Sequence, residues 1–441
     1  MKKVFIFLYL LLFLSIGIFA QTINLEQARE LALANSRSLA QYEMDIRNSI
    51  LNERSQLYSM LPEISAGYSA SADFLKNWEF VNPMDNFSAG ANISITQIIF
   101  QGGRSFIQKA ISEIRTERVR INARSEYFNV LDEIDNAYYN VLRAGAALEA
   151  IETSLQIAVL GLSIAEIRFS SGMINQGEYM EALAEKETRE NTRNQARRSL
   201  TSSMNKFKSL TGITESVELE QIVFDNYEDV ISHLAGISEE QADVLFGNLR
   251  EIIASSNISL SNAALSNLIA EKNFTLSKRD FAPTISATIF SANMNFLPSY
   301  NAASSGGFSI RGTIPLDFWV LINKREQSRI EYQQAINDYE NTEIKMEQTL
   351  QDALFNLFSQ AGAVLSSRRS LEYRQRSFDY VMERYRLLQS SIYDLSEAAR
   401  NLIESRNSLN NASYSFLQSL SALRSLSALD DEEKLLELLL R

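Results

Sequence analysis

The sequence predicts a predominantly helical α+β protein in which long, coiled-coil-like helical hairpins are joined to four β-strands. The first observation behind this prediction is an internal repeat: residues 25–28 (LEQA) and 239–242 (EEQA) each begin a helical segment, 214 positions apart (239 − 25). The second is that only five of 441 residues are proline, which leaves long stretches free to form unbroken helix. The third is that segments of alternating apolar and polar residues, typical of β-strands, separate these stretches.

Residues 1–20 have the order of a secretory signal peptide. Lys2 and Lys3 precede an apolar run over residues 4–19, and Ala20 is the small residue near which we expect cleavage. This run has about 16 residues, whereas a membrane-spanning helix needs about 20, so a retained anchor is the less favoured alternative. No later run of about 18 apolar residues occurs, and we expect no helical membrane span in the mature chain.

The first repeat covers residues 21–213. Its elements are, in order, a helix over residues 25–61, strands near residues 63–75 and 87–100, a long helix over residues 104–168, a tip turn, and a helix over residues 178–211. Apolar residues along the long helix recur at steps of three, four and seven, which keeps one seam on one side of the helix. Its 65 residues correspond to about 98 Å at roughly 1.5 Å per residue, far longer than the helices of compact domains.

The second repeat covers residues 237–429 and has the same order of elements. These are a helix, strands near residues 284–296 and 307–319, a long helix over residues 324–384, a tip turn, and a helix over residues 393–428. Between the repeats, residues 214–236 form an acidic connector without Lys or Arg, which either packs outside the helices or is a solvated linker. Residues 430–441 form a C-terminal tail.

The strand segments have one apolar face and one face of small polar residues. Ile64 and Ala66 alternate with Ser65 and Gly67, and the strand near residues 87–100 repeats this pattern. Segments of about ten residues with this alternation are typical of transmembrane β-barrels, and a face of Ser, Gly, Asn and Thr suits a water-filled lumen. Four strands cannot close a barrel, because the smallest bacterial barrels have about eight. Either several chains share one barrel, or the hairpins are soluble and bury one face.

The composition excludes several classes of site. The chain has no cysteine, which excludes disulfides, thiolate metal sites and cysteine nucleophiles. His233 is the only histidine, and it lies in the acidic connector without the partners that a catalytic triad or a metal site needs. The net charge of −12 is spread along the chain, which argues against nucleic acid as a partner. We therefore predict no enzymatic activity, no cofactor and no bound metal.

Five local motifs carry a family resemblance that covers nearly the whole mature chain. They are, in order, residues 25–28 (LEQA), Leu61-Pro62, residues 95–104 (ITQIIFQGGR), residues 137–142 (AYYNVL) and residues 168–172 (RFSSG). In this order they resemble the TolC-like outer-membrane efflux family. The resemblance implies a homotrimer, in which three chains form a single twelve-stranded barrel in outer-membrane lipid that continues as an α-helical barrel in the periplasm.

The resemblance also implies partners and a function. The partners are a periplasmic adaptor (membrane fusion) protein and an inner-membrane transporter, in a tripartite system for drug efflux or type I protein secretion. The chain is then expected to be a passive exit channel in the bacterial outer membrane with a large periplasmic portion. The alternative that the residues leave open is a soluble periplasmic coiled-coil adaptor or structural spacer protein.

The resemblance places the periplasmic entrance of the channel at the two tip turns. Residues implied for the gate or constriction are Asp394, Glu397, Glu178 and Tyr385, and residues implied for the helix tips and adaptor docking are Arg168, Phe169, Gly172, Met173, Arg384 and Leu388. The i, i+3 spacing of Asp394 and Glu397 puts both on one helix face, so three chains would present stacked acidic rings that favour cations. An ordinary solvated helix face is the alternative.

Two positions at the second tip depart from the family pattern. Leu388 stands in place of the usual tip glycine, and Ser390 stands in place of a basic latch residue. The resemblance therefore leaves the inter-helix ion pair of the tip in question, although Arg384 or Arg386 could take over its role.

Overall fold

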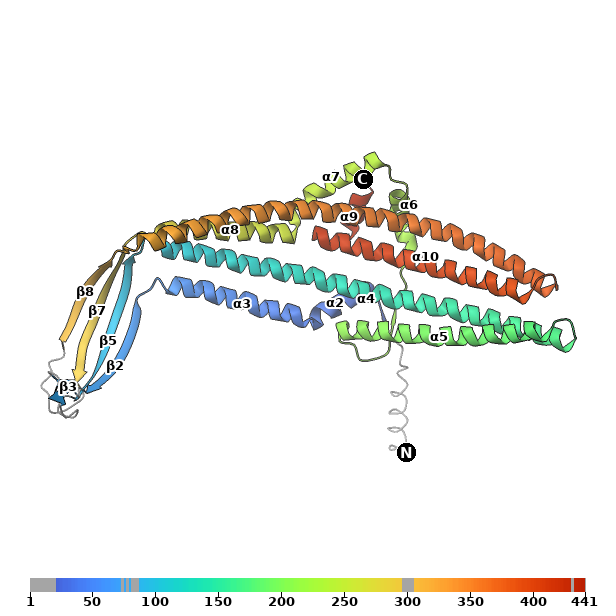
Figure 1. Cartoon of the computed structure of the whole chain (residues 1–441), viewed down its shortest axis with the longest axis horizontal. Coiled ribbons are helices and arrows are strands. Elements are labelled where there is room, and N and C mark those ends of the chain that lie inside the picture. The colour runs from blue at the N-terminus through green and yellow to red at the C-terminus, as the bar shows by residue number, and fades with distance from the viewer. Residues whose placement is uncertain are drawn as a thin grey trace, which may run out of the picture. The chain divides into compact units, whose positions relative to one another are not determined.

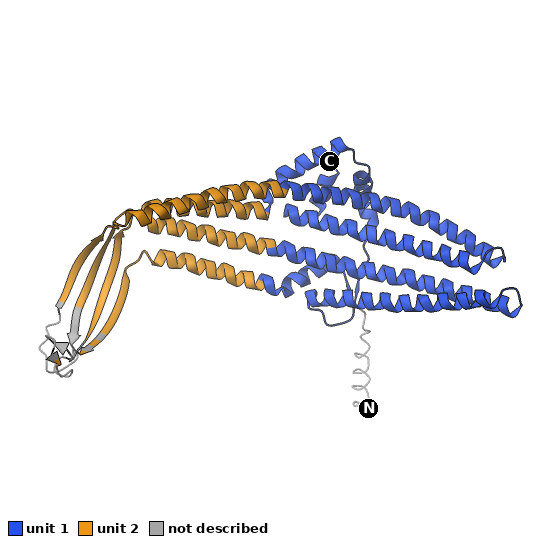
Figure 2. Cartoon of the chain, in the orientation of Figure 1, with its two compact units in different colours: residues 1–39, 126–257, 347–441 blue, residues 40–125, 258–346 orange. Residues whose placement is uncertain are grey.

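The computed structural model describes residues 21–72, 75–76, 79–80, 87–295, 305–429 and 432–440, and the predicted signal peptide lies outside these residues. The chain divides into two compact units (Figure 2): residues 1–39, 126–257 and 347–441 form unit 1, and residues 40–125 and 258–346 form unit 2. Each unit contains matching segments of both repeats. The compact units therefore cut across the repeats, whereas the predicted division followed each repeat along the sequence.

Two long helices and two shorter ones form the helical hairpins (Figure 1). α4 (Arg104–Ser170) has 67 residues and α9 (Phe318–Arg386) has 69, so each is about 100 Å long at roughly 1.5 Å per residue. α5 (Gln176–Thr211) follows the tip of α4, and α10 (Ile392–Ser427) follows the tip of α9. By length and composition alone, α4 is the one described helix that could cross a membrane; a core helix passes the same test, so this is weak evidence for a helical span.

The core of unit 1 follows the predicted seam of α4. Phe128, Leu131, Ile134 and Tyr138 recur at steps of three and four, and all four side chains are buried. The buried Tyr138 hydroxyl donates a hydrogen bond to the backbone carbonyl oxygen of Glu220 at 2.7 Å. The spacing of apolar residues therefore predicted correctly which side of this part of α4 is packed.

Each helix predicted at the start of a repeat is in fact two helices separated by one residue. The four helices are α2 (Leu25–Asn35), α3 (Arg37–Tyr58), α7 (Glu239–Ser256) and α8 (Ile258–Arg279). Ser36 separates the first pair with extended backbone (ψ 113°), and its hydroxyl accepts a hydrogen bond from the Leu39 N–H at 3.3 Å. Asn257 separates the second pair with similar backbone (ψ 125°). Short polar side chains such as those of Ser36 and Asn257 compete for backbone hydrogen bonds. This competition explains why the helix predicted over residues 25–61 is interrupted at Ser36.

The four long strands form one antiparallel sheet in unit 2, in the order β2-β5-β7-β8. They are β2 (Glu63–Ala72), β5 (Phe87–Phe100), β7 (Thr284–Asn295) and β8 (Ser305–Thr313). β5 of the first repeat pairs with β7 of the second, so the sheet joins the two repeats side by side. A separate short pair consists of β3 (Leu75–Lys76) and β4 (Glu79–Phe80).

The last strand is shorter than predicted. The sequence predicts a strand near residues 307–319, but β8 ends two residues before Pro315 and α9 begins at Phe318. Proline has no N–H to donate to a neighbouring strand, so pairing stops before it. The Asp317 carbonyl oxygen then accepts a hydrogen bond from the Val320 N–H at 2.9 Å, which starts the helix.

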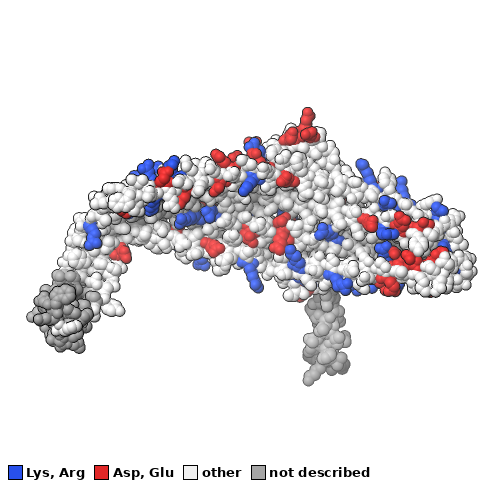
Figure 3. All heavy atoms as spheres, viewed as in Figure 1, with Lys and Arg blue, Asp and Glu red and all other residues white. Residues whose placement is uncertain are grey.

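One face of the sheet is apolar and exposed. A row of directly paired residues crosses all four strands on this face: Ile64, Ile95, Ile289 and Phe308. Their exposed fractions are 72%, 39%, 58% and 64%. Neighbouring residues on the other face are polar, as in the paired row Glu63, Thr96, Thr288 and Ser309, where the Thr96 and Thr288 hydroxyl oxygens lie 3.1 Å apart. Few charged side chains occur on the described strands in the view of Figure 3.

The acidic connector and the C-terminal tail both contain regular structure that packs in unit 1. The connector holds β6 (Val217–Leu219), η1 (Phe224–Tyr227) and α6 (Glu228–Ala235), and the tail holds α11 (Glu432–Leu439). β6 pairs in parallel with β1 (Gln21–Ile23). Ile231 and Leu234 of α6, and Leu435 and Leu439 of α11, are buried. The alternative of a solvated linker is therefore wrong for residues 214–236.

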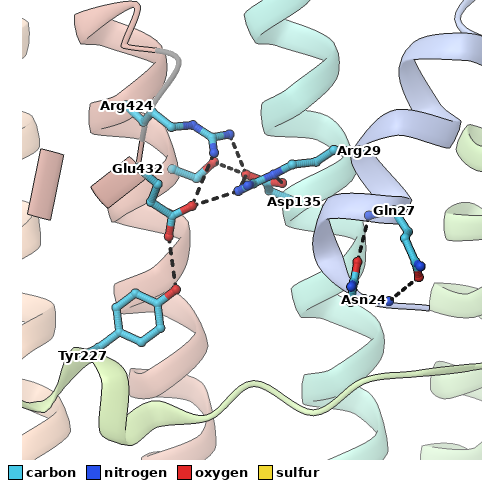
Figure 4. A network of polar contacts seen from close by, with 8 residues as sticks. Asn24, Gln27, Arg29, Asp135, Tyr227, Arg424 and Glu432 are labelled. Carbon is cyan, nitrogen blue, oxygen red and sulfur yellow. Dashed lines mark hydrogen bonds and ion pairs between the residues drawn. The ribbon is translucent and has the colours of Figure 1, made fainter. Parts of the chain in front are cut away.

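A buried network of charges joins the tail to the helices of unit 1 (Figure 4). Asp135 of α4 is fully buried and accepts hydrogen bonds from Arg29 Nε of α2 at 2.7 Å and from Arg424 Nη2 of α10 at 2.8 Å. Glu432 of α11 accepts from Arg29 Nη2 at 3.1 Å and from the Tyr227 hydroxyl at 3.1 Å. Burial lowers the pKa of Arg29, but Asp135 and Glu432 outweigh that effect and raise it. These contacts fix four helices and the connector together.

Candidate functional site

The first hairpin of unit 1 turns through a tight helix cap at the end of α4. The Met173 N–H donates to the Arg168 carbonyl oxygen at 2.8 Å, and the Gly172 N–H donates to the Phe169 carbonyl oxygen at 3.0 Å. This pair of bonds is a Schellman motif, which requires left-handed backbone at its central residue. Gly172 has φ +72°, and a Cβ there would meet no atom within 4 Å. Glycine suits this turn because of its backbone, not for lack of space.

The second hairpin turns through the same cap without a glycine. The Gln389 N–H donates to the Arg384 carbonyl oxygen at 2.8 Å, and the Leu388 N–H donates to the Tyr385 carbonyl oxygen at 3.2 Å. Leu388 has φ +63°, a region that costs a residue with a Cβ about 1–2 kcal/mol. The position at which the resemblance predicts a glycine thus has the left-handed backbone that favours glycine, while it holds an exposed leucine.

Two of the predicted gate carboxylates are hydrogen-bonded to the caps of the following helices. Asn175 caps α5 by accepting from the Glu178 N–H at 3.0 Å, and its side chain donates to Glu178 Oε1 at 2.9 Å. Asp394 has the matching position in α10, where its Oδ2 accepts from the Ser391 N–H at 2.9 Å and from the Ser390 hydroxyl at 2.8 Å. The hydrogen bond from the Ser391 backbone, followed by those from the two serine hydroxyls, lowers the pKa of Asp394. Asp394 therefore carries a stable negative charge at the tip.

The other two predicted gate residues differ in their exposure. Glu397 is exposed, one helical turn after Asp394. Tyr385 is only 1% exposed, so its side chain is buried within the chain. Its role in a gate stays a prediction, as does that of Asp394, Glu397 and Glu178.

Tyr385 instead forms a buried joint between the two hairpins with Arg168. The Arg168 guanidinium carbon lies 4.2 Å from the centre of the Tyr385 ring, and Arg168 Nη2 donates to the Tyr385 carbonyl oxygen. The Tyr385 hydroxyl donates to the Gly161 carbonyl oxygen at 3.3 Å, and burial raises its pKa. Arg168 is 7% exposed. Its role in adaptor docking stays a prediction.

The remaining predicted docking residues lie open at the tips. Phe169, Met173 and Leu388 are 41%, 64% and 59% exposed, and Gly172 and Arg384 are also exposed. Leu387 and Tyr393, which the sequence analysis did not single out, add to the exposed apolar surface of the second tip. Exposed apolar patches of this kind mark interaction surfaces.

The two arginines considered as replacements for the latch bond locally instead. Arg384 Nη2 donates to the Gln389 carbonyl oxygen at 2.8 Å within its own tip. Arg386 lies 3.8 Å from Glu383 on the same helix. Among the residues that the structure describes, neither is seen in an ion pair between the two hairpins. No group of three His, Asp or Glu side chains in this described part is arranged to hold a metal ion.

The residues that sequence reasoning missed are those of the charge network around Asp135. Arg29 and Arg424 lie 106 and 289 positions from Asp135, so no local motif joins them. The one available signal was Asp135 itself, a charged residue beside the seam positions Ile134 and Tyr138.

Comparison with known proteins relates the whole fold to one group. Residues 28–213 and 249–429 match the family described as outer membrane efflux protein. Outer membrane protein TolC of Salmonella enteritidis is 20% identical over 421 residues, which cover 90% of this chain and 80% of that protein. The structure of the Campylobacter jejuni CmeC outer membrane channel has a TM-score of 0.76 at 17% identity, covering 95% of this chain and 89% of that one. For VceC of Vibrio cholerae these values are 0.72, 15%, 91% and 96%.

Proposed function

Because this chain belongs to the outer membrane efflux protein family, it is an outer-membrane exit channel and neither an enzyme nor a soluble adaptor, and we propose that three copies of it form one conduit. In this proposal the four-stranded sheets of three chains close into one twelve-stranded barrel in the outer membrane. The long helices continue the conduit in the periplasm, and the two tips of each chain surround its entrance.

The observation that carries this proposal is the exposed apolar row across β2, β5, β7 and β8. A row of Ile and Phe side chains that is 39–72% exposed in one chain suits contact with lipid, and the opposite face of Thr and Ser suits a wet lumen. In the described chain β2 and β8 pair on one side only. Unpaired N–H and C=O groups cost several kcal/mol each in lipid, so the two edges must pair with other copies.

We propose that Asp394, Glu397 and Glu178 form acidic rings at the entrance. Asp394 and Glu178 follow the caps of α10 and α5 at matching positions, which favours a similar height at the tips. In three copies each residue type supplies three carboxylates, and closely spaced carboxylates attract cations and repel anions. The conduit is therefore expected to be cation-selective.

We also propose that the tips dock a periplasmic adaptor protein, which connects the conduit to an inner-membrane transporter. Met173 and Leu388 support this step, because they are 64% and 59% exposed at the ends of the hairpins. The conduit itself needs no energy source in this proposal. It passes substrates that the transporter supplies.

Single-channel recording in planar lipid bilayers tests the proposal. Asp394→Asn with Glu397→Gln removes two charges per copy, while Asn at 394 can still accept the hydrogen bond from the Ser391 N–H. Cation selectivity should fall toward the ratio of the ion mobilities, and block by multivalent cations should weaken. Unchanged selectivity would remove both residues from the conduit.

The matched control is Glu26→Gln with Glu30→Gln, which removes the same charge from exposed positions of α2. α2 lies beside the end of α5 that is remote from the tip, where Asn35 Nδ2 donates to the Leu210 carbonyl oxygen at 3.1 Å. Selectivity should stay at the wild-type value in this control. A purified, folded protein that gives no conductance steps at all would refute the proposed conduit itself.

A further inference from the structure

The two tips of one chain are related by a constant offset in the sequence. Arg168 and Arg384 are 216 positions apart (384 − 168), as are Phe169 and Tyr385. Both pairs occupy the same positions of the same Schellman cap, because the Arg carbonyl accepts the longer-range bond and the aromatic carbonyl accepts the shorter-range one in each tip. The tips are therefore equivalent in backbone geometry.

The side chains of the two tips are not in equivalent surroundings. Arg168 of the first tip and Tyr385 of the second are buried against each other, with the guanidinium 4.2 Å from the ring centre. The complementary pair, Phe169 and Arg384, is open. Phe169 is 41% exposed, and in the described part of the chain its ring stacks on Tyr179 of its own hairpin, with ring centres 5.1 Å apart. Arg384 is exposed and donates to the Gln389 carbonyl oxygen of its own tip, and its guanidinium carbon lies 5.7 Å from the centre of the Tyr380 ring on the same helix.

The same offset relates a packed helix face to an open one. On α4, the residues Ser154, Ile157, Ala158 and Gly161 line a small cavity that is also lined by α10 and by Ala182 of α5. The offset leads from these positions to Ser370, Tyr373, Arg374 and Ser377 of α9. All four line an open groove of unit 1, whose other side is formed by the end of α6 at Ser232 and Ala235. Tyr373 in this groove is 65% exposed.

A matching face is open on α5. Leu395 of α10 is 2% exposed, and with Ser396 it lines the same small cavity. The offset leads from these two residues back to Tyr179 and Met180 of α5, and Met180 is 50% exposed. Each chain thus carries counterparts of both halves of its internal hairpin joint at its surface: Tyr373 of the α9 groove and Met180 of α5 are exposed.

We propose that these open faces pair between copies, so that the Arg384 guanidinium of one copy lies over the Phe169 ring of the next. The α9 groove of one copy then receives the α5 face of its neighbour, as α4 and α10 pack within a chain. This inference rests on the proposed trimer and names the residues that join its tips. A surface that binds a different surface on the next copy gives a head-to-tail interface, which closes into a ring when the rotation permits.

The joint between copies differs from the joint within a chain in two contacts. Tyr385 donates its hydroxyl to the Gly161 carbonyl oxygen at 3.3 Å, but Phe169 has no hydroxyl to offer the corresponding carbonyl of Ser377. Arg384 also bonds the Gln389 carbonyl of its own tip. The entrance therefore alternates between joints of two kinds, three within chains and three between chains.

Cysteine cross-linking tests the pairing, because the natural chain has no cysteine. Purified assemblies that carry Phe169→Cys with Arg384→Cys are treated with a short bis-maleimide and separated under denaturing conditions. We expect ladders of covalent dimers and trimers. Arg168→Cys with Tyr385→Cys calibrates the reagent, since this pair has the same predicted geometry within one chain and should cross-link without an increase in mass.

Single-cysteine variants and an independent measurement of assembly separate the outcomes. Phe169→Cys alone or Arg384→Cys alone should give no dimer, because a head-to-tail interface does not bring a residue against its own copy; dimers from a single variant would overturn the pairing. Trimers by light scattering, without a ladder from the double variant under conditions that cross-link the calibrating pair, would also overturn it. Absence of trimers in the untreated protein would contradict the proposed trimer itself.

Discussion

Replacing Leu388 with glycine relieves the one unfavourable backbone conformation at the tips. Leu388 has φ +63° in a cap whose counterpart in the first hairpin is Gly172, with φ +72°. The left-handed region costs a non-glycine residue about 1–2 kcal/mol. Glycine avoids that cost but loses about 0.5–1 kcal/mol through its greater freedom when the tip opens. The net expectation is a tip that is more stable by about 0.5–1 kcal/mol.

Hydrogen exchange of the backbone amides measures this change where it occurs. The Leu388 and Gln389 N–H groups are bonded within the cap, to carbonyl oxygens 3.2 and 2.8 Å away, so they exchange when the tip opens. A gain of about 0.5–1 kcal/mol should slow their exchange about two- to fivefold in Leu388→Gly. A local readout is preferable to a melting temperature, because large assemblies commonly unfold irreversibly.

Two variants show whether the backbone is the cause. Leu388→Ala removes the exposed side chain but keeps a Cβ in the left-handed region, so exchange should stay near the wild-type rate. Gly172→Ala should accelerate exchange at the first tip about two- to fivefold, since its Cβ meets no atom within 4 Å and only φ opposes it. Equal effects of glycine and alanine at position 388, or faster exchange in Leu388→Gly, would refute the reasoning.

Two further predictions concern unit 1. Asp135→Ala removes the nearer carboxylate of the buried Arg424, which keeps Glu432 at 3.4 Å, and should destabilise unit 1 by about 1.5–3 kcal/mol. The change is seen as a lower temperature for loss of helical circular dichroism, and a change below about 1 kcal/mol would show that the network is not structural. Burial raises the pKa of Asp132 above 3.8, so the folded chain holds a proton that the unfolded chain has released, and stability falls as pH rises through that window. Asp132→Asn should therefore flatten this decline between about pH 4 and neutral pH, and an unaltered pH profile would rule out Asp132 as its source.

Several elements of the fold follow directly from local sequence. The LEQA and EEQA motifs begin α2 and α7, and in each helix the glutamine completes a capping box with Asn24 or Ser238. The alternation around Ile64 predicted the two faces of the sheet, because the side-chain period of a strand is fixed. The equivalence of Leu388 to Gly172 was also visible in the repeat, and it indicates the left-handed cap that the structure contains.

Other features depend on contacts that no local pattern encodes. The partners of Asp135 come from α2 and α10, and they lie 106 positions before it and 289 positions after it in the sequence. The burial of Arg168 and Tyr385 follows from the packing of one hairpin on the other, whereas their sequence pattern is the same as that of the exposed pair Phe169 and Arg384. At Pro315 the local pattern itself was misleading. The alternation of apolar and polar residues continues past Pro315 and predicted a strand to residue 319, but strand pairing ends before the proline.

The mass of the intact assembly, released from the outer membrane in detergent and measured by native mass spectrometry, tests the central claim most directly. Each chain supplies four strands with two edges that must pair in lipid, so the mass should equal three processed chains. A mass that corresponds only to a monomer or a dimer would contradict the shared barrel on which the account depends.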